Sequence, residues 1–276
     1  SFLGMAVGAV ANIFMDWLFI FPFQMGVIGA AVASGLGQIA AVLVLLTHFL
    51  RKRGSLRLGG FHPSASLMGK ICKRGVPEAV SQLNTPVTAF CYNLVLADLV
   101  GDMGVSTFSV LSFIYSLANA ILSGVAQGLQ PLWGNHYGQK DTGGLKSLLR
   151  DGIAINTVLA VLVYGVLFLL ATPIICIFNQ EPALVEAASK ALPLFALSFI
   201  LMALNLIFTA YFYSTKRTVQ ADVIAVSRGI VVKAVCIFLM PSMLGEGVIW
   251  LAPLAAEGIT LVLSILFNRC SQLAYR

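Results

Sequence analysis

A carboxylate and a carboxamide stand close together in the first apolar segment of the chain. Asn12 and Asp16 lie in the run from Phe2 to Phe21, which carries no other ionisable side chain than Asp16. Residues four apart share one face of a helix, so both side chains can reach a single small cation or bond to each other. An ionised aspartate near the middle of a membrane helix costs roughly 2.5–3.5 kcal/mol. Two interpretations remain open, an ion-binding site or a structural polar pair that joins two helices.

A second pair of opposite charges occurs near the end of the chain. Arg228 and Glu257 lie at similar depth in two successive apolar segments. Unpaired charges at that depth are expensive, so we expect an ion pair between two helices. A structural clasp is favoured over a transport role, which stays open.

A third group of polar and aromatic side chains is distributed over the segments that follow residue 75. We expect amides and hydroxyls there to line a polar cavity, with aromatic rings as walls over which a cation can sit. The expected polar lining residues are Gln82, Asn84, Thr85, Asn93 and Asn119, and the expected aromatic ones are Phe90, Tyr92, Phe113 and Tyr115.

Composition decides which elements must position these residues. The chain has 276 residues, of which 59% are hydrophobic and 10% charged, and its mean hydropathy is +0.92. Apolar residues come in long blocks, which predicts an all-α membrane protein. The formal net charge of +6 could suggest nucleic acid, but the basic residues stand between the apolar blocks. We therefore expect the lipid bilayer, and no nucleic acid, as a partner.

We predict about eight transmembrane helices from the apolar blocks. The fourth is expected to unwind at its inner end, where Gln127, Gln130, Pro131 and Gly134 follow one another. The predicted spans cover residues 2–21, 27–50, 75–100, 103–133, 152–178, 187–213, 219–240 and 247–268.

Charge in the connecting segments predicts the orientation. Most Lys and Arg residues fall after the second, fourth, sixth and eighth predicted spans, whereas the alternate connections are mainly acidic. The positive-inside rule then places both ends of this chain in the cytoplasm, in a multi-pass protein of the cell membrane.

A short internal sequence repeat predicts two related lobes. The string Gly26-Val-Ile-Gly29-Ala-Ala aligns with Gly247-Val-Ile-Trp250-Leu-Ala at an offset of 221 residues, and each copy opens a span after a short outer loop. Repeats of this kind are common in secondary transporters. We expect residues 1–50 to be the last two helices of an amino lobe, 51–74 a basic cytoplasmic linker and 75–276 a complete six-helix lobe. Four helices of the first lobe would then precede this chain.

Six short strings occur in a fixed order along nearly the whole chain. They are Asn12-x-x-x-Asp16, Gly26-Val-Ile-Gly29-Ala-Ala, Gly75-x-Pro77, Gln127-Gly-x-Gln-Pro131-x-x-Gly134-x-x-Tyr137-Gly138, Ser214-Thr-Lys-Arg217 with Arg228, and Gly247-Val-Ile-Trp250-Leu-Ala-Pro253-Leu-Ala-Ala-Glu257. This ordered set resembles the multidrug and toxic compound extrusion (MATE) family. The resemblance implies two lobes, twelve helices and a monomer that exports cationic amphipathic drugs or other organic cations by alternating access, in exchange for H⁺ or Na⁺ and without a cofactor.

The resemblance also implies a cation or proton site. Family members with an amino-lobe site use an Asn and an Asp four apart, a hydroxyl on the next helix and a further Asp on the first helix. Asn12, Asp16 and Ser34 match three of these positions, with Asp16 as a possible ligand of Na⁺, and the fourth position falls outside this chain. Another branch carries an acid where this chain has Thr85, so a carboxylate site of that kind is not expected.

Two rival functions remain. A flippase of lipid-linked precursors on a related architecture should place several Arg or Lys residues inside its spans. Only Arg228 and Lys233 lie deep within a predicted span, since Lys190 stands near the start of its span. An intramembrane enzyme would need a nucleophile with its base, or a metal constellation. The chain has no H-E-x-x-H, no G-x-S-x-G and no Cys/His cluster, so we do not expect an enzyme.

Overall fold

The structure, a computed structural model, describes residues 2–50, 64–69, 71–72 and 83–273. Most of these residues are helical, and no strand occurs within these ranges. The chain divides between Met68 and Gly69 into two compact units, which we call the amino unit and the carboxy unit. The expected linker, residues 51–74, lies largely outside the described ranges, so the domain boundaries stay a prediction.

The amino unit is a helical hairpin. Helix α1 (Phe2–Ile20) and helix α2 (Gly26–Leu50) pack against each other along their length. The short connection between them turns back with Gln24 and Gly26 in the left-handed region, at φ values of 50° and 55°. This reversal makes the two helices antiparallel and brings residues early in α1 beside residues late in α2.

Glycines let the two helices of the hairpin approach closely. A Cβ added at Gly8 would lie 2.8 Å from the Ala41 Cβ, and one added at Gly37 would lie 2.8 Å from the Asn12 Cβ. Small residues at such contacts are typical of membrane helix pairs. Gly4 and Gly8, four residues apart in α1, both lie at this contact with α2.

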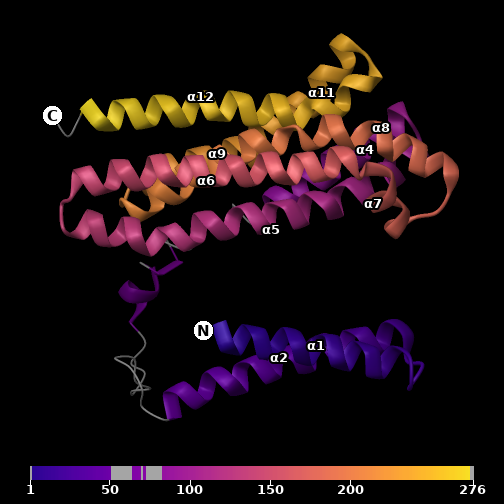
Figure 1. Ribbon diagram of the computed structural model, residues 1–276, viewed down its shortest axis with the longest axis horizontal. Coiled ribbons are helices and arrows are strands. Elements are labelled where there is room, and N and C mark those ends of the chain that lie inside the picture. The colour runs from indigo at the N-terminus through magenta and orange to yellow at the C-terminus, as the bar shows by residue number, and fades with distance from the viewer. Residues whose placement is uncertain (1, 51–63, 70, 73–82, 274–276) are drawn as a thin grey trace. The chain divides into compact units, whose positions relative to one another are not determined.

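The carboxy unit is a bundle of long helices and shorter pieces (Figure 1). Its long helices run side by side, and α9 contacts α5, α6, α10 and α12. The described elements are α4 (Asn84–Leu99), α5 (Asp102–Gly138), α6 (Thr142–Leu169), α7 (Ala171–Phe178), α8 (Pro182–Ala196), α9 (Ser198–Ser214), α10 (Thr218–Val226), the π-helix η1 (Ser227–Val231), α11 (Val232–Leu244), the 3₁₀-helix η2 (Glu246–Leu251) and α12 (Ala252–Leu273).

Six helical stretches of the described residues are long and apolar enough to cross a membrane, and they coincide with six of the predicted spans. The first predicted span is a shorter apolar helix, and the beginning of the third lies outside the described residues. The all-α membrane class is thus confirmed. The six stretches are Gly26–Thr47, Asp102–Gly138, Thr142–Leu169, Pro182–Ser214, Thr218–Leu244 and Gly247–Arg269.

The fourth span does not unwind over residues 127–134, contrary to the prediction. Helix α5 continues through Pro131 to Gly138. A proline removes one backbone hydrogen bond, and here burial outweighs that loss because Ala126 and Trp133 pack into a core cluster with Leu149 and residues of α9. Gly124 and Gly128 of the same helix do not mark a close helix contact, because an added Cβ at either would meet no described atom within 4 Å.

Helix α9 lies at the centre of the carboxy unit because its buried residues join two core clusters. Phe199 belongs to one cluster with Tyr92 and Leu111, and Phe212 belongs to the other with Trp133. The buried Asn156 of α6 donates a hydrogen bond of 2.9 Å to the carbonyl of Ala203 in α9. This bond satisfies a polar side chain within the apolar core and fixes the two helices in register.

Candidate ion site and solute cavity

The amino unit brings two of its three expected ligands together. Asn12 Nδ2 donates to Ser34 Oγ at 3.5 Å, a contact that the absent Cβ of Gly37 permits. Asp16 lies one turn further along α1, and its Oδ1 is buried with no hydrogen-bond partner among the described residues. A carboxylate oxygen in that state has the capacity to accept a proton or to bind a cation.

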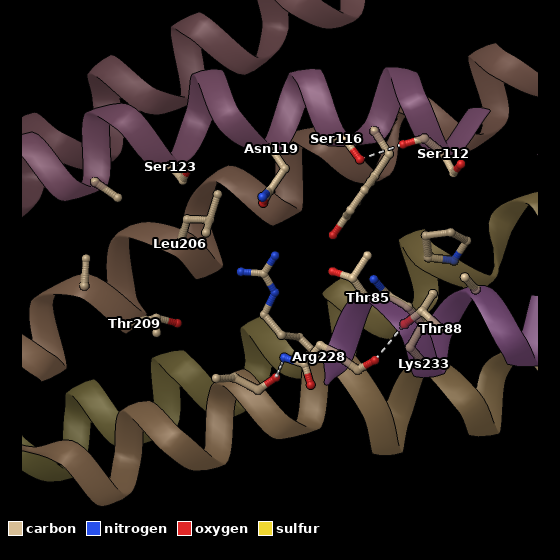
Figure 2. Close-up of a pocket in the computed structure, with 18 of the residues that line it drawn as sticks. Thr85, Thr88, Ser112, Ser116, Asn119, Ser123, Leu206, Thr209, Arg228 and Lys233 are labelled. Atoms are coloured by element: carbon tan, nitrogen blue, oxygen red, sulfur yellow. Dashed lines mark hydrogen bonds between the residues drawn. The ribbon is translucent and has the colours of Figure 1, made fainter. Parts of the chain in front are cut away.

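The carboxy unit contains a cavity of about 450 Å³, with the size of a pocket for a small organic molecule. Helices α4, α5, α8, α9, α10, η1 and α11 contribute to its wall, with Pro253 of α12. Figure 2 shows hydroxyl, amide and cationic side chains from several of these elements directed into the same space. The polar and aromatic lining residues are Asn84, Thr85, Thr88, Tyr92, Phe108, Ser112, Tyr115, Ser116, Asn119, Ser123, Gln127, Gln130, Phe195, Thr209, Tyr213, Arg228 and Lys233.

Three of the five expected polar lining residues line this cavity, namely Asn84, Thr85 and Asn119. Asn93 does not, because Thr85, Thr88 and Tyr92 define the cavity face of α4 and the next residue is rotated by about 100°. Gln82 lies outside the described residues.

Two of the four expected aromatic residues line the cavity and two do not. Tyr92 and Tyr115 line the cavity, and the Tyr92 ring stacks on Phe108 with ring centroids 4.3 Å apart. Phe90 and Phe113 point away from it and are 67% and 64% exposed. Rings on that outer surface of an apolar helix bundle suit contact with lipid.

A polar stripe along α5 was predicted only in part, because Asn119 was expected in the cavity lining and the serines of the stripe were not. Its members recur every three or four residues and so share one helix face, which is the signal that could have revealed them. The two glutamines of the stripe, expected to lie where the helix unwinds, belong to the cavity wall. The stripe consists of Ser112, Ser116, Asn119, Ser123, Gln127 and Gln130.

Arg228 and Glu257 form the expected ion pair. The Arg228 Nε lies 3.4 Å from Glu257 Oε1, and the side chains are 11% and 1% exposed. Asn205 of α9 donates to Glu257 Oε2 at 2.7 Å, and Ser264 donates to Asn205 Oδ1 at 3.0 Å. The carboxylate is therefore held in a buried network that the sequence did not reveal, since neither Asn205 nor Ser264 stands out by type or spacing.

A π-helix presents Arg228 to the cavity. The turn Ser227–Val231 adds one residue to the regular helical repeat, and side chains of α4 bind carbonyls in and beside it. Asn84 Nδ2 donates to the Ala225 carbonyl at 3.1 Å, and Thr88 Oγ1 donates to the Gly229 carbonyl at 2.9 Å. Such π-turns occur frequently at functional sites.

Comparison with known proteins assigns the chain to a family of membrane proteins. The MatE family model matches residues 77–239, which is more than half of the chain. The chain belongs to the MatE family. It is a multi-pass membrane protein of the multidrug and toxic compound extrusion type.

Individual relatives and solved structures share only about a quarter of their residues or fewer with this chain. The multidrug export protein MepA of Staphylococcus saprophyticus is 26% identical over 269 residues, covering 96% of this chain and 59% of MepA. The outward-facing structure of a multidrug resistance MATE family transporter of the MOP superfamily gives a TM-score of 0.89 at 22% identity, covering 99% of this chain and 62% of that one. A crystal structure of MATE in the straight conformation gives 0.88 at 21% identity, with the same two coverages. The chain spans about three fifths of the length of the proteins it matches.

Proposed function

We propose that this chain forms part of a secondary transporter that exports small amphipathic molecules in exchange for H⁺ or Na⁺. The observation that carries the proposal is the 450 Å³ cavity, walled by hydroxyls, amides and aromatic rings among membrane-spanning helices. Family membership and the description of MepA as a multidrug export protein support the same function. Transport then requires two lobes that alternate in their access to the two sides of the membrane.

Asn12, Asp16 and Ser34 are proposed to bind the coupling ion. A carboxylate in an apolar helix is costly unless it binds a partner, and Asp16 Oδ1 has none among the described residues. The Ser34 hydroxyl, which Asn12 already contacts, supplies a further oxygen nearby. Coupling follows if occupancy at Asp16 favours one lobe conformation over the other.

Localisation and assembly follow from the same reasoning. We propose a monomer in the cell membrane with both ends of this chain in the cytoplasm, supported by the basic connections after alternate spans. No enzymatic step is proposed.

The test is gradient-driven export by the natural full-length protein in liposomes. With an imposed pH or Na⁺ gradient, wild type is expected to move a fluorescent organic cation such as ethidium, and Asp16→Asn is expected to abolish the gradient dependence. Asp98→Asn, an exposed carboxylate outside the cavity lining, serves as the matched control. Unchanged gradient dependence in Asp16→Asn would rule out the proposed ion site.

A second candidate function is favoured by one observation. Arg228 and Lys233, the two basic residues expected deep within spans, both line the cavity. A flippase that handles the anionic head group of a lipid-linked precursor requires cations in that position. The charge of the cavity is therefore the feature that separates the two candidates.

A further inference from the structure

We propose that Lys233 forms an anion-binding subsite in the cavity of the carboxy unit, which takes a carboxylate or phosphate group of an amphipathic solute. The inference rests on the proposed transport function and names the chemical class of its substrate. It departs from the expectation of purely cationic substrates that the family resemblance raises.

The charges that face the cavity carry one sign. Arg228 and Lys233 are the charged residues among the described lining residues, and the lining contains no described Asp or Glu. Glu257 does not line the cavity, and its carboxylate is held by Arg228 and Asn205. An organic cation that entered would therefore meet two like charges and no described carboxylate.

The two cations differ in their partners. Arg228 is compensated by Glu257, so this pair adds no net formal charge. Lys233 is 5% exposed and has no hydrogen bond or ion pair to a described residue; its Nζ lies 5.2 Å from the centroid of the Tyr115 ring. A cation–π contact offsets only part of the cost of removing an ammonium group from water. The buried Lys233 is thus the group that an anionic ligand would stabilise.

Neutral donors surround the same space. Figure 2 shows the Arg228 guanidinium extending into the cavity towards Asn119, with Thr85 and Thr88 close to Lys233. Hydroxyl and amide groups complete the hydrogen bonds of a carboxylate or phosphate that an ammonium group attracts. The rings of Tyr92 and Tyr115 provide apolar surface in the same cavity. Together these features suit an amphipathic molecule with one acidic group.

A matched pair of dyes tests the subsite directly. Rhodamine B carries a free carboxylate, and its methyl ester has the same ring system without that charge. We expect the full-length protein in detergent to bind the acid about tenfold more tightly than the ester, because hydrogen bonds to a charged group are the stronger ones. Lys233→Gln should reduce this ratio to about one, whereas Lys233→Arg should retain a clear preference.

Controls separate a lost subsite from a lost fold. Lys146→Gln removes an exposed charge outside the cavity lining and should keep the tenfold ratio. Lys233→Gln should still bind the ester with wild-type affinity and elute as a monodisperse peak. Equal affinity of wild type for the two dyes, or an unchanged ratio in Lys233→Gln, would overturn the proposal.

Competition identifies the source of the anionic group. Displacement of bound rhodamine B by a polyprenyl phosphate, and not by the uncharged polyprenol, indicates a lipid-linked phosphate; displacement by 1-naphthoate alone indicates a soluble carboxylate. If neither anion displaces the dye, the subsite is excluded. Gradient-driven export of the ester tests the transport function separately, because it does not depend on the carboxylate.

Discussion

The Arg228 guanidinium and the Glu257 carboxylate, 3.4 Å apart, join the π-helical turn η1 to α12. The same carboxylate accepts a hydrogen bond from Asn205 of α9, so three elements meet at one buried group. Arg228 also lines the cavity. This geometry couples the shape of the cavity wall to the packing of the bundle.

Loss of either charge of this pair should destabilise the carboxy unit. Breaking a buried ion pair by removing one partner costs roughly 3–5 kcal/mol, because the remaining charge is left uncompensated. Arg228→Met and Glu257→Gln are each expected to lower the thermal unfolding midpoint in detergent, and the double variant should recover much of the loss. The exposed pair of Lys190 and Glu186 is the control, since Lys190→Met should have no measurable effect. Additive losses in the double variant would argue against pairing.

The hairpin offers a test with two neighbouring glycines of α2. A Cβ at Gly37 would press against Asn12, whereas one at Gly35 meets no atom within 4 Å. Gly37→Ala is therefore expected to separate Asn12 from Ser34 and to reduce gradient-driven export at least several-fold, while Gly35→Ala should transport like wild type. Equal export by the two variants would show that this contact is not needed for coupling.

A side chain at Gly229 should displace the Asn84 amide, because a Cβ there would overlap it. Overpacking of this kind typically costs about 1–3 kcal/mol. We expect Gly229→Ala to lower the thermal midpoint and to disturb the bond between Asn84 and the Ala225 carbonyl. The smaller residue in Gly229→Ala/Asn84→Ser should restore part of the stability. Gly165→Ala, with open space around its Cβ, is the matched control, and an equal loss there would point to a general effect of alanine in these helices.

Asp141 should stabilise the α5–α6 connection in a pH-dependent way. Its carboxylate caps α6 by accepting from the Gly144 N–H at 2.9 Å and lies 2.9 Å from His136 Nδ1. The Gly144 N–H, followed by His136, lowers the pKa of this carboxyl from its ordinary value of 3.8. Because the pKa is lowered on folding, the stabilisation is present at pH values above 3.8 and is lost as the pH falls through the folded-state pKa.

Asp141→Ala should therefore be less stable than wild type at pH 7, and this difference should vanish in strong acid. Thermal midpoints measured from pH 7 down to about pH 2, below the ordinary pKa of the carboxyl, check the prediction. Asp151→Ala, which removes an exposed carboxylate within α6, should show no comparable pH dependence. A difference between Asp141→Ala and wild type that persists unchanged at the lowest pH would exclude the carboxylate as its cause.

The hydropathy pattern, and the free-energy cost of burying a charge in the membrane, were enough to predict the spans and the buried ion pair. Hydropathy alone identified the apolar spans, since lipid leaves a helix as the simplest way to satisfy every backbone polar group. An unpaired charge within the membrane costs free energy, and Arg228 and Glu257 were expected at similar depth. We therefore predicted an ion pair between them, and the structure contains it. The four-residue spacing of Asn12 and Asp16, with the family motif, selected α1 as the candidate ion site, although coupling stays a proposal.

Hydropathy does not predict the rotation of each helix about its own axis. Only the tertiary structure determines that rotation. Tyr92 faces the cavity and the adjacent Asn93 faces outward, because packing of α4 against η1 and α5 sets that rotation. The same packing carries α5 through Pro131 and turns Lys233 towards Tyr115. Sequence thus determined which polar residues must be accommodated within the membrane. Only the assembled bundle decided which of them share a cavity, because that depends on contacts between segments far apart in the chain.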